Sequence, residues 1–329
     1  MVDRASIEIR DRLDPDDARI LGQMLSTAES VDGTSSLDAD ALTDLTQQGR
    51  PGLAAVIARE PEHHRPVGYA QVSRGPSGWT LEYVVDPWFR TPGATVGEDL
   101  ARGAVRHIAS VGGGALRLWI AGPRPADVRV AAAAGLVATR ALYQVRRPLP
   151  VDQELTATAK ALPTRPFRPG EDESAWLEVN NRAFAWHPEQ GHWDLATIAG
   201  REAEPWFDPE GFLLHEEFGR LTGFCWTKVH RDRDPVEGEI YVIAVDPGAG
   251  RHGLGRALVL AGLDHLARLG ITVGMLYVDA DNTGAVKLYV DLGFEVDIVN
   301  RAYTGSVESV HDDPGPLAAS GPDLTPTTP

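Results

Sequence analysis

Cysteine is almost missing from this chain of 329 residues, which has a single one, Cys225. One thiol makes neither an internal disulfide framework nor a multi-thiolate metal site, so we expect no bound metal. Positive charge is also scarce, because 31 Lys and Arg stand against 47 Asp and Glu, for a net charge of −16. Such an acidic chain repels polyphosphates, which disfavours nucleic acids and membrane surfaces as partners.

Long apolar runs are missing as well. No stretch approaches the roughly 20 apolar residues of a membrane-spanning helix, and residues 1–12 lack the apolar core of a signal peptide. We therefore expect a cytoplasmic protein, and a monomer. At about 150 residues per domain, the length predicts two domains or one large one.

Three landmarks recur in the same order in the two halves of the chain, at offsets of 155 to 160 residues. They are a glycine-containing apolar run, an apolar run that ends in Asp-Pro, and a glycine before a further apolar run, at Gly68 and Gly223, 81–87 and 240–247, and Gly135 and Gly293. A period this long is far beyond a solenoid repeat and predicts a tandem duplication of one domain.

The composition between these halves suggests the domain boundaries. Residues 149–165 are rich in Pro and Thr, which is typical of a linker between domains over 1–148 and 166–304. Residues 305–329 are acidic and rich in Pro, and we expect a disordered tail there.

Residue patterns in the second half alternate between strands and helices, which predicts a mixed α/β domain. The expected helices are 175–184, 254–269 and one that ends at Asp291 and is capped by Asn282 or Asp281. The expected strands are 211–215, 221–229, 240–245, 271–278 and 294–302.

The segment over residues 242–256, V-I-A-V-D-P-G-A-G-R-H-G-L-G-R, is the most informative in the chain. An apolar strand runs into a glycine-rich turn that opens a helix. The unpaired N–H groups of such a turn lie at the positive end of the helix dipole and suit a phosphate or pyrophosphate. Arg251, His252 and Arg256 add positive charge to this anion site.

Two other phosphate-binding motifs fit this segment poorly. A Walker loop requires Lys-Ser or Lys-Thr after its last glycine, and neither follows here. Gly248, Gly250 and Gly253 spell G-x-G-x-x-G, but the acid that closes the next strand, Asp279, comes 29 residues after Gly250. A dinucleotide-binding fold places that acid about 20 residues on.

The same segment resembles the pyrophosphate motif of the GNAT superfamily of acyl-CoA-dependent N-acetyltransferases. That motif is a strand ending in V-x-P, then Gln or Arg, two residues, Gly, any residue, and Gly or Ala. Gly250 stands where Gln or Arg is usual, and Arg251 follows it. Residues 282–294 resemble the superfamily's next landmark, N-x-x-A-x-x-x-Y-x-x-x-G-F. The resemblance implies an α/β (α+β) fold of two tandem domains, each a mixed, mostly antiparallel sheet flanked by helices, with acetyl-CoA as donor.

The resemblance also implies which residues hold the donor. In the second half they are Ile243, Ala244, Val245, Gly250, Arg251, His252, Gly253, Leu254, Gly255, Arg256, Asn282, Thr283, Gly284, Ala285, Val286 and Lys287. In the first half the motif is degraded, because residues 90–95 read R-T-P-G-A-T and Pro92 lacks an N–H. That half could hold a second CoA at Val84 and Val85, and we expect it to be non-catalytic.

Residues 180–191, 206–211, 226–230, 238–242 and 276–282 further resemble a tandem branch of the superfamily. That branch acetylates the amine of a cysteinyl-glucosaminyl-inositol thiol precursor. The resemblance implies acceptor contacts at Glu189, Lys228, Glu239 and Tyr277, and at Asp38 or Asp40 in the first half. Carboxylates and other hydrogen-bonding groups suit an amine that carries many hydroxyls. Another small amine remains an alternative acceptor.

Acetyl transfer to an amine requires a deprotonated amine, stabilisation of the oxyanion and protonation of the leaving thiolate. We expect Glu239 to be the general base and the backbone N–H groups near residues 243–245 to bind the thioester carbonyl. Tyr289 matches the superfamily's usual general acid. Cys225 as an acyl-carrying nucleophile is a rival that lacks a surrounding His-Asp pattern. A CoA-binding module without turnover is the alternative from another class, and amine-dependent release of CoA discriminates between them.

Overall fold

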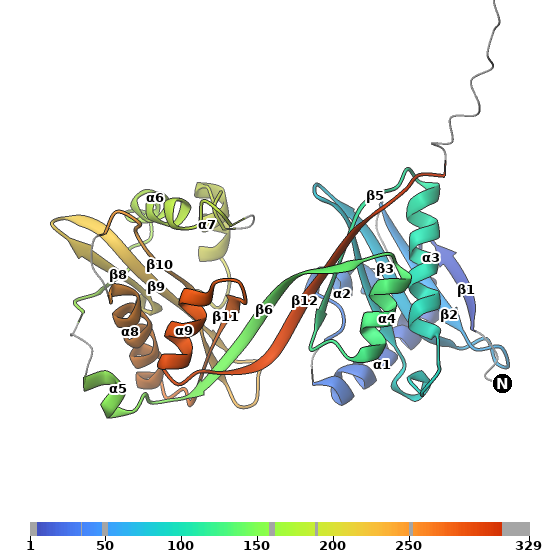
Figure 1. Cartoon of the computed structure of the whole chain (residues 1–329), viewed down its shortest axis with the longest axis horizontal. Helices are drawn as coiled ribbons and strands as arrows, with labels where there is room; N and C mark the ends of the chain where they lie inside the picture. The colour runs from blue at the N-terminus through green and yellow to red at the C-terminus, as the bar shows by residue number, and fades with distance from the viewer. Residues whose placement is uncertain are drawn as a thin grey trace, which may run out of the picture. The chain divides into compact units, whose positions relative to one another are not determined.

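The computed structural model of the chain describes residues 5–33, 35–47, 52–157, 162–187, 190–249 and 253–310. Contacts divide the chain into two compact units: unit 1 is Met1–Arg140 with Asn300–Pro329, and unit 2 is Ala141–Val299. Each unit is a sheet with helices on both faces (Figure 1). Within the described ranges, no helix combines the length and the apolar character that crossing a membrane requires.

The sheet of unit 1 has the strand order β1-β2-β3-β4-β5-β12. Neighbouring strands are antiparallel except β4 and β5, which are parallel. The strands are β1 Ser6–Arg10, β2 Leu53–Arg59, β3 Pro66–Gly75, β4 Gly78–Val85, β5 Gly114–Ala121 and β12 Glu295–Val307. Helices α3 Val96–Ser110 and α4 Pro125–Ala133 cover one face, and α1 Pro15–Asp32 and α2 Ala39–Thr46 cover the other.

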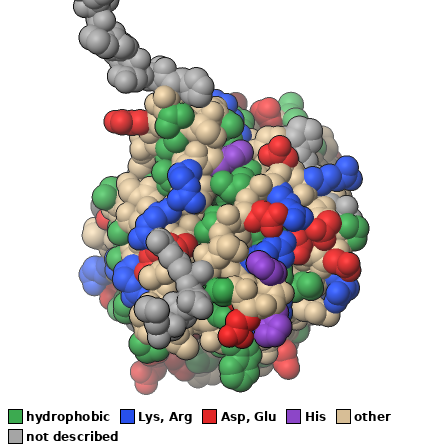
Figure 2. Space-filling view, turned by 90° about the vertical axis from the view of Figure 1, so that its right-hand side faces the viewer, with side chains coloured by type: hydrophobic (Ala, Val, Ile, Leu, Met, Phe, Trp, Pro, Cys, Tyr) green, Lys and Arg blue, Asp and Glu red, His purple; other side chains and the backbone are tan. Residues whose placement is uncertain are grey.

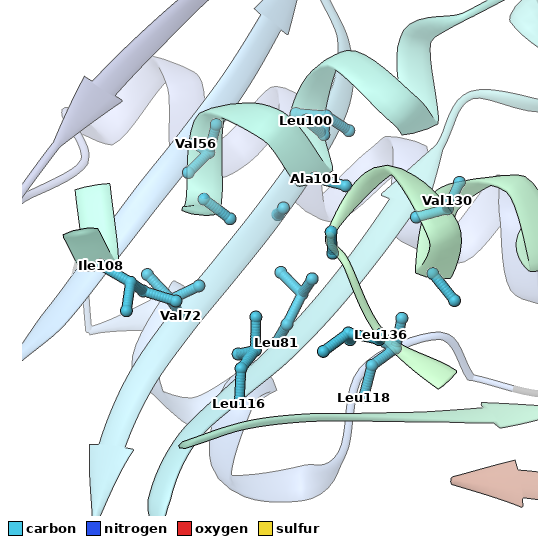
Figure 3. Close-up of a cluster of buried hydrophobic side chains, with 14 of the residues drawn as sticks. Val56, Val72, Leu81, Leu100, Ala101, Ile108, Leu116, Leu118, Val130 and Leu136 are labelled. Atoms are coloured by element: carbon cyan, nitrogen blue, oxygen red, sulfur yellow. The ribbon is translucent and has the colours of Figure 1, made fainter. Parts of the chain in front are cut away.

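Aliphatic side chains from the sheet and from α3 and α4 fill the first of these faces. Figure 3 shows them pointing toward one another between the strands and the two helices, with Leu81 and Leu116 from the sheet beneath Leu100 of α3. Leu81 and Leu100 are fully buried. Each such side chain contributes roughly 1.5–3 kcal/mol of transfer free energy, so this layer is the main source of the unit's stability.

Unit 2 has the strand order β6-β11-β10-β9-β8-β7, with β10 and β11 as its parallel pair. The strands are β6 Val137–Pro148, β7 Arg165–Pro166, β8 Phe212–Glu217, β9 Arg220–His230, β10 Glu237–Val245 and β11 Val273–Asp279. The helices are α5 Gln153–Ala157, α6 Glu173–Ala183, α7 Leu195–Glu202, α8 Leu254–Arg268 and α9 Thr283–Asp291. Short 3₁₀ turns occur at η1 Pro87–Phe89 in unit 1 and η2 Pro209–Gly211 in unit 2.

The two faces of this second sheet differ in chemistry. Helices α8 and α9 pack leucines against it, with Leu258 and Leu263 fully buried. The face covered by α6 and α7 is aromatic instead: Trp226 stacks on Phe212 with ring centroids 4.3 Å apart. Trp176 of α6 meets the edge of Trp226 at 5.8 Å. The aromatic face also carries the polar groups described below.

The helices and strands predicted in the second half are confirmed to within a few residues. Strands β8 and β9 form the expected antiparallel pair, and Asn282 rather than Asp281 caps α9 by accepting from the Ala285 N–H. Gly270 and Gly293 follow helices with φ of 81° and 79°, where a side chain would be strained. The α/β fold and its tandem repeat are likewise confirmed.

The landmarks of the duplication occupy matching places in the two sheets. The runs that end in Asp-Pro are β4 and β10, and the glycine-containing runs are β3 and β9. A Cβ on Gly68 would lie 2.9 Å from Leu100 of α3, and one on Gly223 would lie 2.8 Å from Leu258 of α8. Both glycines therefore let a helix approach the sheet closely, for the same reason in each unit.

The two units divide at residues 140–141 and 299–300, and the predicted domain boundaries lie at residues 148 and 305. The chain leaves unit 1 within β6, whose residues from Leu142 onward pair with β11, and it returns within β12, which pairs with β5 from Asn300 to Val307. Residues 149–165 also contain α5, and Val307 ends a strand inside the predicted tail. Strands β6 and β12 thus each begin in one unit and end in the other. Residues 311–329 lie outside the described residues.

Basic and acidic side chains are interspersed on the face of the molecule that Figure 2 draws. Opposite charges also pair within the described residues, as where Arg59 of β2 bonds Asp17 at 2.5 Å and Glu8 at 2.9 Å. Such pairs hold α1 and β1 to β2 in unit 1.

Tyr303 tests the contribution of the returning strand to unit 1. This residue of β12 is 3% exposed and belongs to the core between the sheet and helices α3 and α4, and its hydroxyl has no hydrogen-bond partner among the described residues. We expect Tyr303→Ala to lower the free energy of unfolding by about 3–5 kcal/mol, as measured by urea denaturation. Tyr303→Phe removes only an unpaired hydroxyl and should be neutral or stabilising. Val296→Ala, at a position 48% exposed, is the matched control. Equal effects of the two alanine variants would contradict the assignment.

Candidate active site

The parallel pair β10 and β11 separates part-way along its length. The strands are in register only at Glu237, Gly238 and Glu239 of β10, although β10 continues to Val245 and β11 to Asp279. A strand in a sheet directs half of its N–H and C=O groups to each side. The residues of β10 beyond Glu239 therefore offer backbone groups toward the opening between the strands, where a ligand can bind them.

A β-bulge lies at the same point. The register between β10 and β9 shifts between Ile240 and Val242, so that Tyr241 is the extra residue. Bulges bend a strand and redirect its side chains. Tyr241 and Val242 both pack on the aromatic face as a result, while Ile243 packs on the leucine face with α8 and α9.

The turn after β10 is held by Asp246. Its carboxylate accepts the Gly248 N–H at 2.9 Å and the Arg182 guanidinium at 2.7 Å. The Arg182 hydrogen bond keeps the pKa of Asp246 below its ordinary value. Helix α6, which carries Arg182, is thereby fixed to the turn that leads into α8.

Helix α8 begins at Gly253, which has φ of 91° and open space where a Cβ would be. No side chain of the described residues caps this helix end, and its first turn contains no acid. Free N–H groups and an unopposed dipole fit a pyrophosphate. The predicted contacts Gly250, Arg251 and His252 lie outside the described residues.

The other predicted donor contacts fall into three environments. Ile243, Ala244 and Val245 line the separated part of β10, and Leu254 and Gly255 start α8. Asn282, Thr283, Gly284, Ala285, Val286 and Lys287 form the start of α9, where Asn282 serves as the cap and Lys287 pairs with Asp291 at 2.9 Å. The Arg256 guanidinium donates a hydrogen bond to the carbonyl of Leu155 in α5 at 3.3 Å.

Tyr289 of α9 is buried against the leucine face and meets the edge of Phe294 at 5.7 Å. Burial raises the pKa of the Tyr289 phenol above its ordinary value, so the hydroxyl is protonated at neutral pH. The Arg147 guanidinium donates to the Leu292 carbonyl and fixes the end of the helix that carries Tyr289. Burial also raises the pKa of Cys225 to about 12, which favours a packed thiol over a nucleophile.

Glu239 and Lys228 lie directly opposite each other on β10 and β9, and residues in such positions share a face of the sheet. The Lys228 ammonium lies 4.5 Å from the ring centre of Trp206 and 5.6 Å from that of Tyr241, which is cation–π geometry. His230, two residues beyond Lys228, contacts Glu239 with 2.7 Å between Nε2 and Oε2. The aromatic face thus brings a carboxylate, an ammonium and an imidazole together.

The loop after α6 borders the end of β11. Asn180 donates to the Gln190 carbonyl at 2.9 Å, and His187 lies 3.9 Å from Asp279. Glu189, the predicted acceptor contact on this loop, lies outside the described residues. Tyr277 of β11 is 40% exposed and interacts with Arg233.

Asp38 belongs to unit 1, where its carboxylate caps α2 by accepting the Ala41 N–H at 2.8 Å. Its own N–H donates to Glu82 of β4, also at 2.8 Å. Burial raises the pKa of Glu82 to about 7, and the negative charges of Asp38, Asp44 and Asp40 add to the shift. Sequence patterns did not reveal Glu82, because its partners come from a different part of the chain.

In unit 1 the corresponding strands also separate, since β4 and β5 pair only from Trp79 to Leu81 of β4. In unit 1, side chains of the unit itself connect β4 to helix α4 across the opening between the strands. Tyr83 of β4 donates to Asp127 of α4 at 2.6 Å, and Arg124, which precedes α4, bonds Asp127 and Asp32. In unit 2 the matching positions of Tyr83 and Asp127 are Ile243 and Ala285, which form no such bridge.

The two units also differ at the N-terminal end of the helix that would bind the pyrophosphate, which is α3 in unit 1 and α8 in unit 2. The first turn of α3 holds Glu98 and Asp99, whereas Arg256 stands at the position of Glu98 in α8. Arg90 of the degraded motif donates to the Val85 carbonyl at 2.8 Å and to Asp32 at 2.7 Å. Val84 and Val85, the predicted second CoA contacts, are buried in the core. Acidic groups at a helix N-terminus oppose an anion, so we expect unit 1 to bind CoA more weakly than unit 2, and a second CoA there stays a prediction.

Comparisons with known proteins show the family to which the chain belongs. The model of the acetyltransferase (GNAT) family matches residues 174–294. A mycothiol acetyltransferase of Acidimicrobium ferrooxidans is 44% identical over 85% of this chain and 92% of its own. The mycothiol acetyltransferase of Thermobispora bispora is 41% identical over 90% of this chain and 98% of its own.

Two solved structures share the fold. A GCN5-related N-acetyltransferase from Sphaerobacter thermophilus superposes with a TM-score of 0.65 at 23% identity, covering 92% of this chain and 96% of its own. A tandem GNAT protein from the clavulanic acid biosynthesis pathway superposes with a TM-score of 0.61 at 19% identity, covering 92% and 99%. Fold and family match define a tandem GNAT acetyltransferase, an acyltransferase enzyme. Within that class, the chain belongs to the mycothiol acetyltransferase family.

Of the site residues, His230, Trp206 and Tyr241 were missed by sequence reasoning. A signal for His230 exists, because Trp226, Lys228 and His230 alternate along one strand and must share a face. Among the described residues, no group of three or more His, Cys, Asp or Glu side chains is arranged to hold a metal ion.

A matched pair of glycine variants tests which unit binds the donor. Gly253 and Gly93 both have positive φ, 91° and 84°, and open space around a Cβ, so valine strains the backbone equally at both. We expect Gly253→Val to weaken CoA binding about tenfold or more, because the ligand approaches the backbone there. Gly93→Val should leave the affinity unchanged. Calorimetry should find one CoA per chain. Two sites per chain would show that unit 1 also binds CoA, and a loss confined to Gly93→Val would assign the donor site to unit 1.

Glu82 predicts a pH dependence of stability. Between its ordinary pKa of 4.5 and about 7, the folded chain keeps a proton that the unfolded chain releases. Stability therefore falls as pH rises through this window. Glu82→Gln removes this loss, so it should stabilise the protein at pH 8 by of order 2 kcal/mol relative to pH 5. Thermal unfolding at several pH values measures it, with exposed Glu29→Gln as control. A stability difference between Glu82→Gln and the parent that does not change with pH would exclude this titration.

Proposed function

We propose that unit 2 transfers an acetyl group from acetyl-CoA to the amine of the cysteinyl-glucosaminyl-inositol precursor, which completes mycothiol. The observation that carries the proposal is the separation of β10 from β11 directly beyond Glu239. It leaves backbone groups, a carboxylate and the uncapped end of α8 around one opening. Membership of the mycothiol acetyltransferase family supports the acceptor.

The donor would bind along that opening. The N–H groups at the start of α8 suit the pyrophosphate, and the backbone of Ile243–Val245 suits the thioester carbonyl and the amides of the pantetheine arm. Bound acetyl-CoA supplies the activated acetyl group. The N–H groups that hold its carbonyl also stabilise the negative charge that develops there when the amine attacks.

Glu239 acts as the general base. It removes a proton from the acceptor ammonium, directly or through water, and the free amine then attacks the carbonyl carbon. Tyr289 acts as the general acid and protonates the thiolate of CoA as the carbon–sulfur bond breaks. The buried, protonated phenol of Tyr289 suits that role.

The acceptor would lie on the aromatic face. Lys228 and Tyr277 offer hydrogen bonds to its hydroxyls, and Glu189 is the proposed carboxylate contact of this unit. A contact from Asp38, which belongs to unit 1, stays a prediction. Trp206 and Tyr241 hold the Lys228 ammonium, so they fix where it meets the acceptor. The cytoplasmic location and the monomeric state remain predictions.

A Tyr289→Phe variant tests the acid. It removes only the hydroxyl that protonates the thiolate, so kcat should fall of order 10²-fold with little change in KM for acetyl-CoA. Amine-dependent CoA release, followed with a thiol reagent, measures it. Tyr303→Phe, a buried tyrosine of unit 1, should keep full kcat. An unchanged kcat in Tyr289→Phe, with chemistry rate-limiting, would make Tyr289 a packing residue.

The acceptor itself is tested by a panel of amines that includes aminosugar conjugates, arylamines, peptides and polyamines. We expect the highest kcat/KM for the cysteinyl aminosugar conjugate. If the protein binds acetyl-CoA but no amine in the panel causes release of CoA, the protein is a CoA-binding module without turnover.

A further inference from the structure

We propose that His230 is the positioning residue of the general base, holding the Glu239 carboxylate by one oxygen and leaving the other to take the proton. The proposal rests on the function proposed above. It begins with the contact of 2.7 Å between His230 Nε2 and Glu239 Oε2. An ionised carboxylate only accepts hydrogen bonds, so the proton in this contact belongs to Nε2 of the imidazole.

Burial makes this bond necessary. Glu239 is 6% exposed, and its side chain lies beside an aromatic cluster. A buried carboxylate without a partner is costly. Lys228 lies opposite Glu239, but its ammonium is held over Trp206. Among the described residues, His230 is therefore the side chain that bonds Glu239, through Oε2, and Oε1 stays available to a substrate amine.

The neighbouring Glu237 shows why the partner is an imidazole. Glu237, two residues earlier on β10, is paired with Arg146 at 2.9 Å and with Arg233. Arginine stays charged at all relevant pH values and holds a carboxylate in its ionised form. An imidazole donates one hydrogen bond from Nε2 and lacks the permanent positive charge of a guanidinium. One strand thus carries a structural carboxylate and a reactive one, distinguished by their partners.

The proton balance is simple. The acceptor ammonium gives one proton to Oε1 of Glu239, and the freed electron pair of nitrogen attacks the acetyl carbon, which leaves the nitrogen positively charged. The carbon–sulfur bond then breaks and the leaving thiolate takes a proton from Tyr289. The nitrogen gives up its second proton to the resulting tyrosinate, directly or through water, so that a neutral amide, a thiol and the restored phenol are formed. His230 keeps its own proton throughout. Its hydrogen bond holds the carboxyl group in one rotamer while Oε1 gains and later loses a proton, which is a positioning role.

Four variants test this role: His230→Phe, His230→Gln, Glu239→Gln and the double variant His230→Phe with Glu239→Gln. We expect His230→Phe to lower kcat about tenfold or more with KM for acetyl-CoA unchanged. His230→Gln keeps an N–H donor near the place of Nε2 and should recover most of kcat. If His230 acts only through Glu239, the double variant should be no slower than Glu239→Gln alone.

The control is His215→Phe. His215 is similarly buried in unit 2 and lies 3.3 Å from Glu217, yet it is outside the site, so kcat should not change. Thermal unfolding checks that each variant folds. Full kcat in His230→Phe, or a His230→Gln as slow as His230→Phe, would overturn the positioning role. So would an undiminished effect of His230→Phe in the Glu239→Gln background. Full kcat in Glu239→Gln would instead overturn the proposed base, whatever the His230 variants do.

Discussion

The site depends on one constraint, the early separation of a parallel strand pair. Strands β10 and β11 share hydrogen bonds over three residue pairs and then separate, although both strands continue. Backbone N–H and C=O groups inside a protein require partners. The backbone groups that an opened sheet leaves unpaired can bind a ligand, a side chain or water. The bulge at Tyr241, the held turn at Asp246 and the glycine at the start of α8 are all arranged around that opening.

The two units meet the same constraint differently. In unit 1, Tyr83, Asp127 and Arg124 bridge the separated strands, and acids occupy the first turn of the following helix. In unit 2, Ile243 and Ala285 stand at the positions of Tyr83 and Asp127, and the end of α8 has no side-chain cap among the described residues and no acid in its first turn. We therefore propose that the opening in unit 2 is the reactive one and that side chains close its counterpart in unit 1.

Local signals predicted much of this. The run from Val242 to Pro247 predicted a strand and a turn, and the spacing from Asn282 to Tyr289 predicted a capped helix. The pairing of β6 with β11 was not predictable, because a sequence pattern can identify a strand but not the strand that it pairs with. The bridge from Tyr83 to Asp127 spans 44 residues, and such a contact leaves no pattern in a single sequence. His230 was missed although its alternation with Lys228 was visible.

Hydrogen–deuterium exchange with and without CoA tests the central claim, that the opening in unit 2 is the donor site and its counterpart in unit 1 is closed. The account predicts slower exchange at the amides of residues 243–245 and 254–256 when CoA is present, because the ligand accepts hydrogen bonds from the strand and the helix end. Exchange at residues 84–85 and 96–98 of unit 1 should not change. Protection in unit 1, or none at residues 243–245, would contradict the account.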